Sequence, residues 1–318
     1  MDPPLPLELQ LHILELALPP QTLRRLPDRR KVLKDFSLLH RDYTKPMQRL
    51  LYAMPHFDLA GDGVPERIKR TLDAADEIEA LVTGLDLRFR TCPFEEIREE
   101  VLDLLRGRAS TVRELAVFLL ARGFPCFGEW LPNLVSLNIA GLRADDVAQY
   151  PPFAFPPRLT RLLLQRCGGS DGFDIPRPPN LVLPPIPTLK TLLIGPRVYL
   201  AQGLDFSASF PLLYTLAIDR DSVGRNAPGY FELSTLPHTL LHLRVELPDT
   251  WTPGEALAFL LTIPRGGLTT LEVYLDDPGM SSVPEELERR AGWMQGVKVD
   301  FTTYPDMPPD IEEWTPAR

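Results

Sequence analysis

The sequence predicts an α/β protein in which short repeats, each with one parallel strand, stack into a solenoid behind a small all-α module. A pattern of three aliphatic residues recurs from about residue 80 to residue 301. The first 58 residues lack this pattern and place apolar residues at helical spacing instead. Proline is also frequent, with 35 in 318 residues, about twice the usual share of roughly 5%.

The first predicted helix covers residues 7–18 and carries two apolar stripes on nearly opposite sides. Pro6 and Glu8 suit its first turn, which needs no backbone donor and favours an acidic side chain. One stripe consists of Leu7, Leu11, Leu14 and Leu18. The other consists of Leu9, Ile13 and Leu16. Since a surface helix needs only one apolar stripe, we expect the other to contact another chain.

Two further helical segments complete the N-terminal module of residues 1–58. The second has an apolar face made of Val32, Phe36, Leu39 and Tyr43. The third begins at Pro46 and carries Met47, Leu50, Leu51 and Met54. The stretch between Leu18 and Phe36 is rich in Arg and Lys, and we expect it to form an exposed loop or an additional basic contact.

Residues 65–79 are predicted to form a helix that joins this module to the first strand. Its apolar face contains Ile68, Leu72, Ala75 and Ile78, and Gly61-Asp62-Gly63 before it reads as a hinge. Because the open end of a solenoid must be covered, we expect this linking segment, at 59–80, to be the N-terminal cap.

The repeated pattern is an aliphatic residue, two variable residues, a second aliphatic residue, one variable residue and a third aliphatic residue. Nine matches begin at Val82, Val112, Leu134, Leu159, Leu189, Leu213, Leu240, Leu268 and Met294. These starts are 22 to 30 residues apart. Such a period resembles that of leucine-rich repeats, in which each unit buries its apolar side only when neighbours stack on it. The resemblance implies a leucine-rich-repeat domain at 59–318, with about nine repeats to 301 and a tail at 302–318.

Alternation along each match directs the second and third aliphatic residues inward and the variable residues outward. Four prolines stand two residues before a first aliphatic position, where a fixed φ suits the entry of a strand: Pro132, Pro157, Pro187 and Pro211. The Asn or Cys usual three residues after the third aliphatic residue is present only as Cys167, so the repeats are degenerate.

The connections between the strands are expected to differ. Helical signals occur around Phe94 to Leu104, Ala256 to Leu260 and Glu285 to Arg290, whereas the stretches 148–157 and 172–187 are rich in proline and predict irregular backbone. The tail from Tyr304 to Arg318 has four prolines and no periodicity, and we expect it to be a loosely held cap or disordered.

Charge and cysteine content exclude several classes of protein. A formal charge of -9 and a pI near 5.2 argue against nucleic acid or an anionic membrane as a partner. The three cysteines, Cys92, Cys126 and Cys167, lie too far apart for a metal cluster or a disulfide framework and favour a reducing compartment. There is no signal-peptide core and no apolar run of about 18 residues. We therefore expect a soluble intracellular protein of the cytoplasm, the nucleus or both.

The sequence lacks the phosphate-binding loop, the nucleophile elbow, His-Glu-x-x-His and Cys-x-x-Cys. Gly168-Gly169-Ser170-Asp171-Gly172 reads as a repeat turn, and His238 and His242 precede or begin a strand, where their spacing does not align metal ligands. The acidic pairs Asp145-Asp146 and Asp276-Asp277 read as solvated turns. We expect no enzymatic activity, no cofactor and no metal.

The N-terminal blocks resemble the F-box of fungal proteins. These blocks are Leu5-Pro6-Leu7-Glu8-Leu9, Ile13-Leu14, Phe36 to Tyr43, and Gln48-Arg49-Leu50-Leu51-Tyr52. The resemblance covers about residues 5–52 and implies docking to a Skp-type adaptor and, through it, a cullin. By position, Leu5 and Pro6 match the docking loop of the family, Glu8 and Leu9 the start of its first helix, and Ile13 and Leu14 its apolar contact.

The outward strand positions are the expected surface for a target protein. They are small or apolar in the early and middle repeats, as at Ser136, Leu163, Thr191, Leu193 and Ala217. The last repeats instead offer His242, Arg244, Glu246, Glu272, Tyr274 and Lys298. Because aromatic and Arg side chains are frequent binding hot spots, we predict the target contact there, with a merely solvated sheet face as the alternative.

The sequence therefore predicts a substrate-recognition subunit of a cullin-RING (SCF-type) ubiquitin ligase, with a target protein as its second partner. The alternative is a leucine-rich-repeat scaffold unrelated to ubiquitin, in which the N-terminal helices only cap the repeats. Binding to a Skp-type adaptor distinguishes the two hypotheses.

Overall fold

The computed structural model contains a ten-stranded, all-parallel sheet and nine α-helices among the residues that it describes. These residues are 5–19, 25–59, 63–89, 99–119, 131–141, 155–167, 181, 183–198, 200, 204–225, 233–275, 278–290, 292–303, 311 and 314. The predicted α/β class is therefore confirmed. Across these ranges, no helix has both the length and the apolar character needed to cross a bilayer.

The N-terminal module consists of three helices. They are α1 (Leu7–Leu16), α2 (Leu26–Leu39) and α3 (Arg41–Ala53). Two helical predictions for this module need correction, because the backbone of His40 is extended and its side chain accepts a hydrogen bond from the Asp42 amide, so that α3 starts there. Tyr43 thus belongs to α3 rather than to α2, and Pro46 lies inside α3 rather than at its beginning.

The basic stretch before Phe36 is largely helix and not the predicted loop. Within it, α2 starts at Leu26 and has Pro27 in its first turn, where a missing backbone donor costs nothing. Leu26 and Leu33 lie two helical turns apart and are both buried, which explains why this polar segment is helical and packed.

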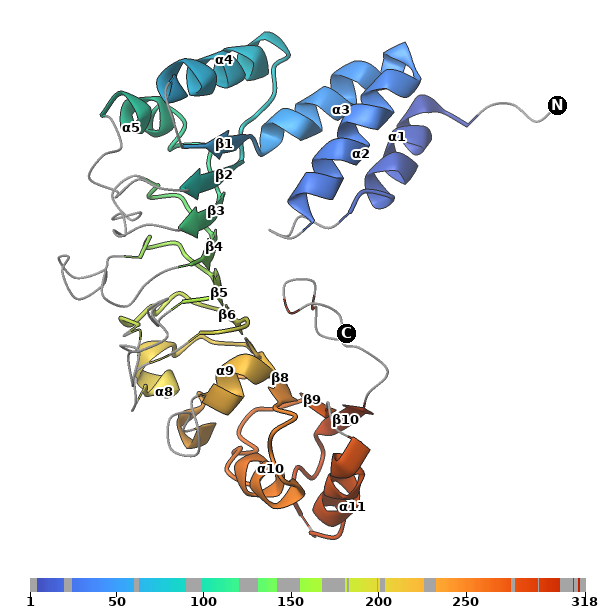
Figure 1. The fold of residues 1–318 in the computed structure, drawn as a ribbon, viewed down its shortest axis with the longest axis vertical. Coiled ribbons are helices and arrows are strands. Elements are labelled where there is room, and N and C mark those ends of the chain that lie inside the picture. The colour runs from blue at the N-terminus through green and yellow to red at the C-terminus, as the bar shows by residue number, and fades with distance from the viewer. Residues whose placement is uncertain are drawn as a thin grey trace.

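The ten strands follow one another across the sheet in chain order (Figure 1). They are β1 (His56–Asp58), β2 (Gly84–Phe89), β3 (Glu114–Leu119), β4 (Ser136–Ala140), β5 (Arg161–Gln165), β6 (Thr191–Ile194), β7 (Thr215–Ile218), β8 (His242–Leu247), β9 (Thr270–Leu275) and β10 (Lys298–Thr303). The sheet thus grows by one strand with each pass of the chain.

The first eight predicted repeat matches coincide with β2 to β9 in register, but the ninth is shifted. Val299 pairs with Leu271 and Phe301 with Val273, so the inward residues of β10 are Val299 and Phe301. The match from Met294 had placed Val297 and Val299 there. Met294 and Gly296 both have positive φ and form a turn, which delays the start of the strand.

The helix predicted at 65–79 is confirmed as α4 (Val64–Glu77), but its position differs from the prediction. The strand β1 precedes it, so α4 connects β1 to β2 and does not come before the first strand. The other helices are α5 (Glu99–Arg106), α8 (Phe206–Ser209), α9 (Arg220–Arg225), α10 (Pro253–Leu260) and α11 (Ser282–Glu288), with short 3-10 turns at η2 (Leu233–Thr235) and η3 (Pro278–Ser281).

Two buried rows of aliphatic side chains run across the sheet and form its core. One row is Leu85, Leu115, Leu137, Leu162, Leu192, Leu216, Leu243 and Leu271. The next is Leu87, Val117, Ile139, Leu164, Ile194, Ile218, Val245 and Val273. None of them is more than 2% exposed, and each such burial stabilises the fold by about 1.5–3 kcal/mol.

The residues between these rows point to the opposite side of the sheet, which we call the variable face. Its central row is Asp86, Ala116, Asn138, Leu163, Leu193, Ala217, Arg244, Glu272 and Asp300. In Figure 1, α4, α5 and α8 lie on one side of the sheet, whereas α1 to α3 lie on the other. The N-terminal module and the tail residues Ile311 and Trp314 therefore lie on the side of the variable face.

Candidate functional site

The two apolar stripes of α1 have different surroundings, as the sequence predicts. Leu11 and Leu14 are half-buried and pack, together with the buried Leu18, against Leu33 and Met47 of α2 and α3. On the other side, three side chains form what we call the outer stripe. They are Leu9, Ile13 and Leu16, with exposed fractions of 50%, 53% and 73%. Leu7, the first residue of the packed stripe, is 38% exposed, so the N-terminal module covers the rest of this stripe and leaves the outer stripe open.

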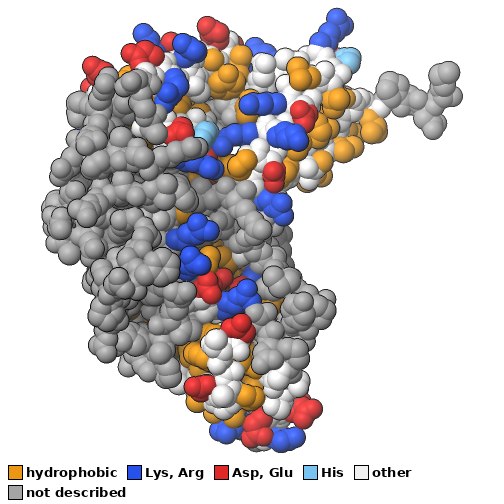
Figure 2. All heavy atoms as spheres, viewed as in Figure 1, with side chains coloured by type: hydrophobic (Ala, Val, Ile, Leu, Met, Phe, Trp, Pro, Cys, Tyr) orange, Lys and Arg blue, Asp and Glu red, His pale blue; other side chains and the backbone are white. Residues whose placement is uncertain are grey.

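Apolar surface continues beyond the outer stripe. Leu5 is 54% exposed, and Leu38 and Leu39 at the end of α2 are 84% and 66% exposed. Leu39 was predicted on the packed face with Phe36, but the helix ends there and its side chain points into solvent. Figure 2 shows hydrophobic side chains gathered over this upper part of the molecule, on the side that carries α1.

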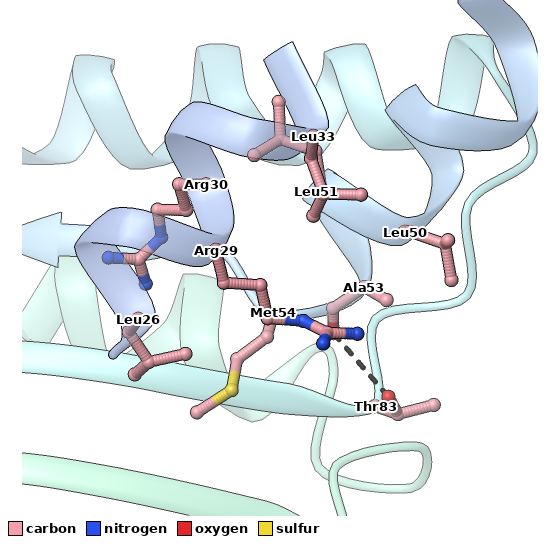
Figure 3. A pocket seen from close by; sticks show the side chains of 9 residues that line it. All are labelled: Leu26, Arg29, Arg30, Leu33, Leu50, Leu51, Ala53, Met54 and Thr83. Carbon is pink, nitrogen blue, oxygen red and sulfur yellow. Dashed lines mark hydrogen bonds between the residues drawn. The ribbon is translucent and has the colours of Figure 1, made fainter. Parts of the chain in front are cut away.

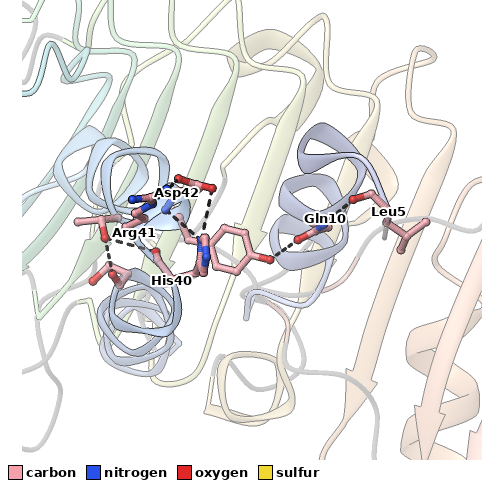
Figure 4. Close-up of polar contacts among 8 residues, drawn as sticks. Leu5, Gln10, His40, Arg41 and Asp42 are labelled. Atoms are coloured by element: carbon pink, nitrogen blue, oxygen red, sulfur yellow. Dashed lines mark hydrogen bonds and ion pairs between the residues drawn. The ribbon is translucent and has the colours of Figure 1, made fainter. Parts of the chain in front are cut away.

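The orientation of α1 is fixed by one polar residue in the seam between its stripes. The Gln10 side-chain amide donates to the Leu5 carbonyl, and its oxygen accepts a hydrogen bond from the Tyr43 hydroxyl of α3 (Figure 4). The His40 ring, which caps α3, contacts Tyr43 at a centroid distance of 5.7 Å. These bonds hold the residues before α1 and the start of α3 against one seam of α1, so its outer stripe faces away.

The six residues predicted to contact an adaptor therefore fall into two groups. Leu5, Pro6, Glu8, Leu9 and Ile13 are exposed. Leu14 instead lies on the packed stripe and contributes to the interior of the module.

A buried carboxylate joins this module to the sheet. The Asp86 side chain on β2 is completely buried and receives a hydrogen bond of 2.7 Å from Arg30 of α2. The Nδ1 atom of His56 on β1 lies 2.9 Å from the same oxygen of Asp86. Burial raises the pKa of Asp86, but the hydrogen bonds and charges of His56 and Arg30 outweigh burial and bring the pKa below its ordinary value. The charged form of Asp86 is the one that the junction stabilises.

A cavity of 180 Å³ lies beside this junction, between the helical module and the sheet (Figure 3). Its walls are Leu26, Arg29, Arg30, Leu33, Leu50, Leu51, Ala53, Met54 and Thr83. The Arg29 guanidinium donates to the Pro19 carbonyl at 2.7 Å, and burial lowers the pKa of Arg29. The cavity is smaller than the roughly 300–1,000 Å³ of usual ligand pockets, so we assign no ligand to it.

Four of the six residues predicted to bind a target, Arg244, Glu246, Glu272 and Tyr274, form one connected cluster. Arg244 pairs with Glu246 and stacks over the Tyr274 ring at 4.6 Å. The Tyr274 hydroxyl donates to Glu272 at 3.3 Å. His242 lies next to this cluster at the start of β8, and its Nδ1 atom is 2.7 Å from the hydroxyl of its partner Thr270 on β9. Lys298 is separate and exposed, and it pairs with Asp300 at 2.7 Å.

The expectation that these side chains point freely into solvent is wrong for two of them. Arg244 is fully buried, and Glu246 is only 8% exposed. The Trp314 ring lies 5.9 Å from the Arg244 guanidinium, and its Nε1 atom donates to Glu272 at 2.7 Å. The tail from Tyr304 was expected to be loosely held or disordered, whereas its two described residues, Ile311 and Trp314, are buried.

Acidic side chains gather at the edge of this cluster. Burial, together with the charge of Glu246, raises the pKa of Asp219 to about 7. The Asp219 carboxylate accepts a hydrogen bond from the Asp221 amide at 2.9 Å, which opposes but does not cancel this effect. Burial also lowers the pKa of His242, although Glu272 opposes it.

The remaining sequence candidates do not add a site. Within the described ranges, no three His, Cys, Asp or Glu residues come together as metal ligands. His242 lies in β8, as predicted from the repeat pattern. The glycine-rich segment 168–172 and the acidic pairs at 145–146 and 276–277 lie outside the described residues. Comparisons with protein families, curated proteins and solved structures found no match to this chain.

Proposed function

We propose that this chain is a non-enzymatic substrate-recognition subunit of a cullin-RING (SCF-type) ubiquitin ligase. In this proposal, α1 to α3 form an F-box-like module that docks a Skp-type adaptor, which in turn binds a cullin. The remainder is a degenerate leucine-rich-repeat solenoid that holds a target protein.

The observation that carries the proposal is the outer stripe of α1. Its three apolar side chains are half-exposed or more, whereas Leu11, Leu14 and Leu18 of the opposite stripe pack inside the module. Burying a Leu or Ile side chain fully is worth about 1.5–3 kcal/mol, so the free chain forgoes stabilisation that a partner can provide. Contiguous exposed apolar surface of this kind is typical of protein interaction sites.

The junction at Asp86 supports a role in which two bound proteins must be held in a fixed arrangement. The contacts of Arg30 and His56 with Asp86 connect α2 directly to the first two strands. A ubiquitin ligase subunit has to present its target at a defined distance from the adaptor, and a buried ion pair restricts rotation between the two parts.

The repeat interpretation is supported by the order and spacing of the strands. Neighbouring strands in the sheet are also neighbours in the chain, and their inward aliphatic residues stay in register from β2 to β9. Stacked repeats of 22 to 30 residues produce this arrangement because each unit contacts only the units before and after it.

Capture of a purified Skp-type adaptor by the full-length chain tests the proposal. We expect the wild type to retain the adaptor and the double variant Leu9→Ala, Ile13→Ala to lose it while remaining folded. Leu81→Ala is the matched control, because Leu81 is 63% exposed but lies in the segment just before β2, outside the N-terminal module. Retention of the adaptor by the double variant would count against the docking proposal.

A further inference from the structure

The middle of the variable face is apolar and buried, although it faces away from the main core. Leu163, Leu193 and Ala217 lie side by side on β5, β6 and β7, and none is more than 2% exposed. The residues that pack on them are Ile311 and Trp314 from the C-terminal tail, and together these five residues form a separate hydrophobic cluster.

Recognition of Trp314 involves both its ring and its polar atom. The ring packs on the apolar strip and lies 5.9 Å from the Arg244 guanidinium, within the range of a cation–π contact. Its indole N–H donates to the Glu272 carboxylate at 2.7 Å, a charge-assisted hydrogen bond. The face therefore supplies both an apolar surface and an acceptor that suit a tryptophan.

We propose that this part of the variable face is a peptide-binding surface for a segment that has an aliphatic residue followed three positions later by Trp. The tail of the chain, with Ile311 and Trp314, occupies this surface until a segment of the same chemistry from a partner protein displaces it. This inference rests on the target-binding half of the proposed function and specifies what the target presents.

The two described residues of the tail contact the variable face through their side chains, which suits exchange. Neither Ile311 nor Trp314 belongs to a helix or strand, and the sheet has no strand from the described part of the tail. The four prolines between Tyr304 and Arg318 also remove backbone donors that an added strand needs. A partner segment can thus replace the tail without breaking the ladder between strands.

Leaving the apolar strip of the variable face uncovered is unfavourable. A partner segment must therefore take the place of the tail, because the tail does not simply dissociate. Without the tail, Leu163 and Leu193 become exposed to water, and Glu272 loses the hydrogen bond from Trp314. The tethered tail also competes at an effective concentration of about millimolar. A partner must therefore supply equivalent contacts or come at high local concentration.

The test uses a fluorescent peptide of residues 304–318 added to full-length protein. We compare the wild type with the variant Ile311→Ala, Trp314→Ala, in which the tethered tail no longer competes. Fluorescence anisotropy should give a Kd at least about tenfold lower for the variant than for the wild type. A peptide with the same two alanines should not bind to either protein.

A third protein tests whether the peptide sits where the tail does. Adding Glu272→Gln to the double tail variant removes the charge of the acceptor and should weaken peptide binding about tenfold. Circular dichroism and the thermal midpoint establish that each variant is folded. If the double variant does not fold, Trp314→Phe, which keeps an aromatic ring but removes the donor, serves the same comparison.

Equal binding of the wild-type and alanine peptides, or no binding to the folded tail variant, would overturn the inference. The inference would also be overturned if light scattering showed that the wild type is a dimer and Trp314→Ala a monomer. The tail of one copy would then occupy the variable face of a second copy. Adaptor capture by the same preparations is scored separately. The tail variants should capture adaptor like the wild type, so a failure at α1 and a failure at the variable face are told apart.

Discussion

The proposed docking through α1 makes a quantitative prediction for the double substitution Leu9→Ala, Ile13→Ala. Both residues lie on the outer stripe and are about half exposed, so their removal leaves the packed stripe of α1 in place. Alanine is at least as good a helix former as Leu or Ile. The change should therefore act on adaptor binding and leave the helix and the fold intact.

The expected loss follows from the exposed fractions. Each substitution removes three carbon atoms from the side chain, and each buried carbon is worth about 0.8 kcal/mol. Since 50% of Leu9 and 53% of Ile13 is exposed, docking can newly bury about half of each side chain. The cost is then about 1.2 kcal/mol per residue and about 2.5 kcal/mol for the pair, which raises Kd about 70-fold at 25 °C.

Isothermal titration of a Skp-type adaptor into the full-length chain measures this change. Leu81→Ala should bind like the wild type, and Leu14→Ala should lower the thermal midpoint because Leu14 packs inside the module. A Kd for Leu9→Ala, Ile13→Ala within about threefold of the wild type, with tight wild-type binding, would refute the role of the outer stripe. A comparable loss in Leu81→Ala would refute its specificity.

Three further predictions concern the free energy of unfolding, which urea denaturation measures. Asp86→Ala deprives Arg30 of its buried carboxylate and should cost about 3 kcal/mol at pH 7. Because the pKa of Asp86 lies below 3.8, that deficit should shrink only in more acid solution. The raised pKa of Asp219 means that the folded chain binds the extra proton between pH 3.8 and about 7, so wild-type stability falls as the pH rises through this range. Asp219→Asn should abolish that fall and raise the free energy of unfolding by at most about 4 kcal/mol above pH 7. A stability difference between this variant and the wild type that does not vary with pH would contradict the prediction. Thr252→Ala removes the capping box of α10 and should cost about 1 kcal/mol.

The strands were predictable because their pattern depends on local sequence. An inward aliphatic row such as that of Leu137 and Leu162 requires the same spacing in each repeat, and this spacing is visible without any structure. The misplaced ninth match shows the limit of this reasoning. The positive φ of Met294 delays the start of β10 by two residues, and an aliphatic residue at that position does not signal it.

Long-range pairing was not predictable from the sequence. Arg30 and Asp86 are 56 residues apart, and Asp86 occupies an outward strand position that reads as solvated. Trp314 lies in a proline-rich tail without periodicity, which gives no indication that its indole reaches Glu272, 42 residues earlier. Both contacts form only once the sheet brings distant residues to one face, so no local sequence pattern predicts them.

Among the described residues, other parts of the same chain consequently cover the variable face at two places. Arg30 of α2 covers Asp86 at the beginning of the central row, and the tail covers Leu163, Leu193 and Ala217 in its middle. The first contact is a buried ion pair that fixes the module, whereas the second is an apolar contact that a peptide can reproduce. Of the two, only the tail contact can open without detaching α1 to α3 from the sheet. Under the proposed function, a target that displaces the tail would therefore leave the outer stripe of α1 in place for the adaptor, and both partners would be bound together.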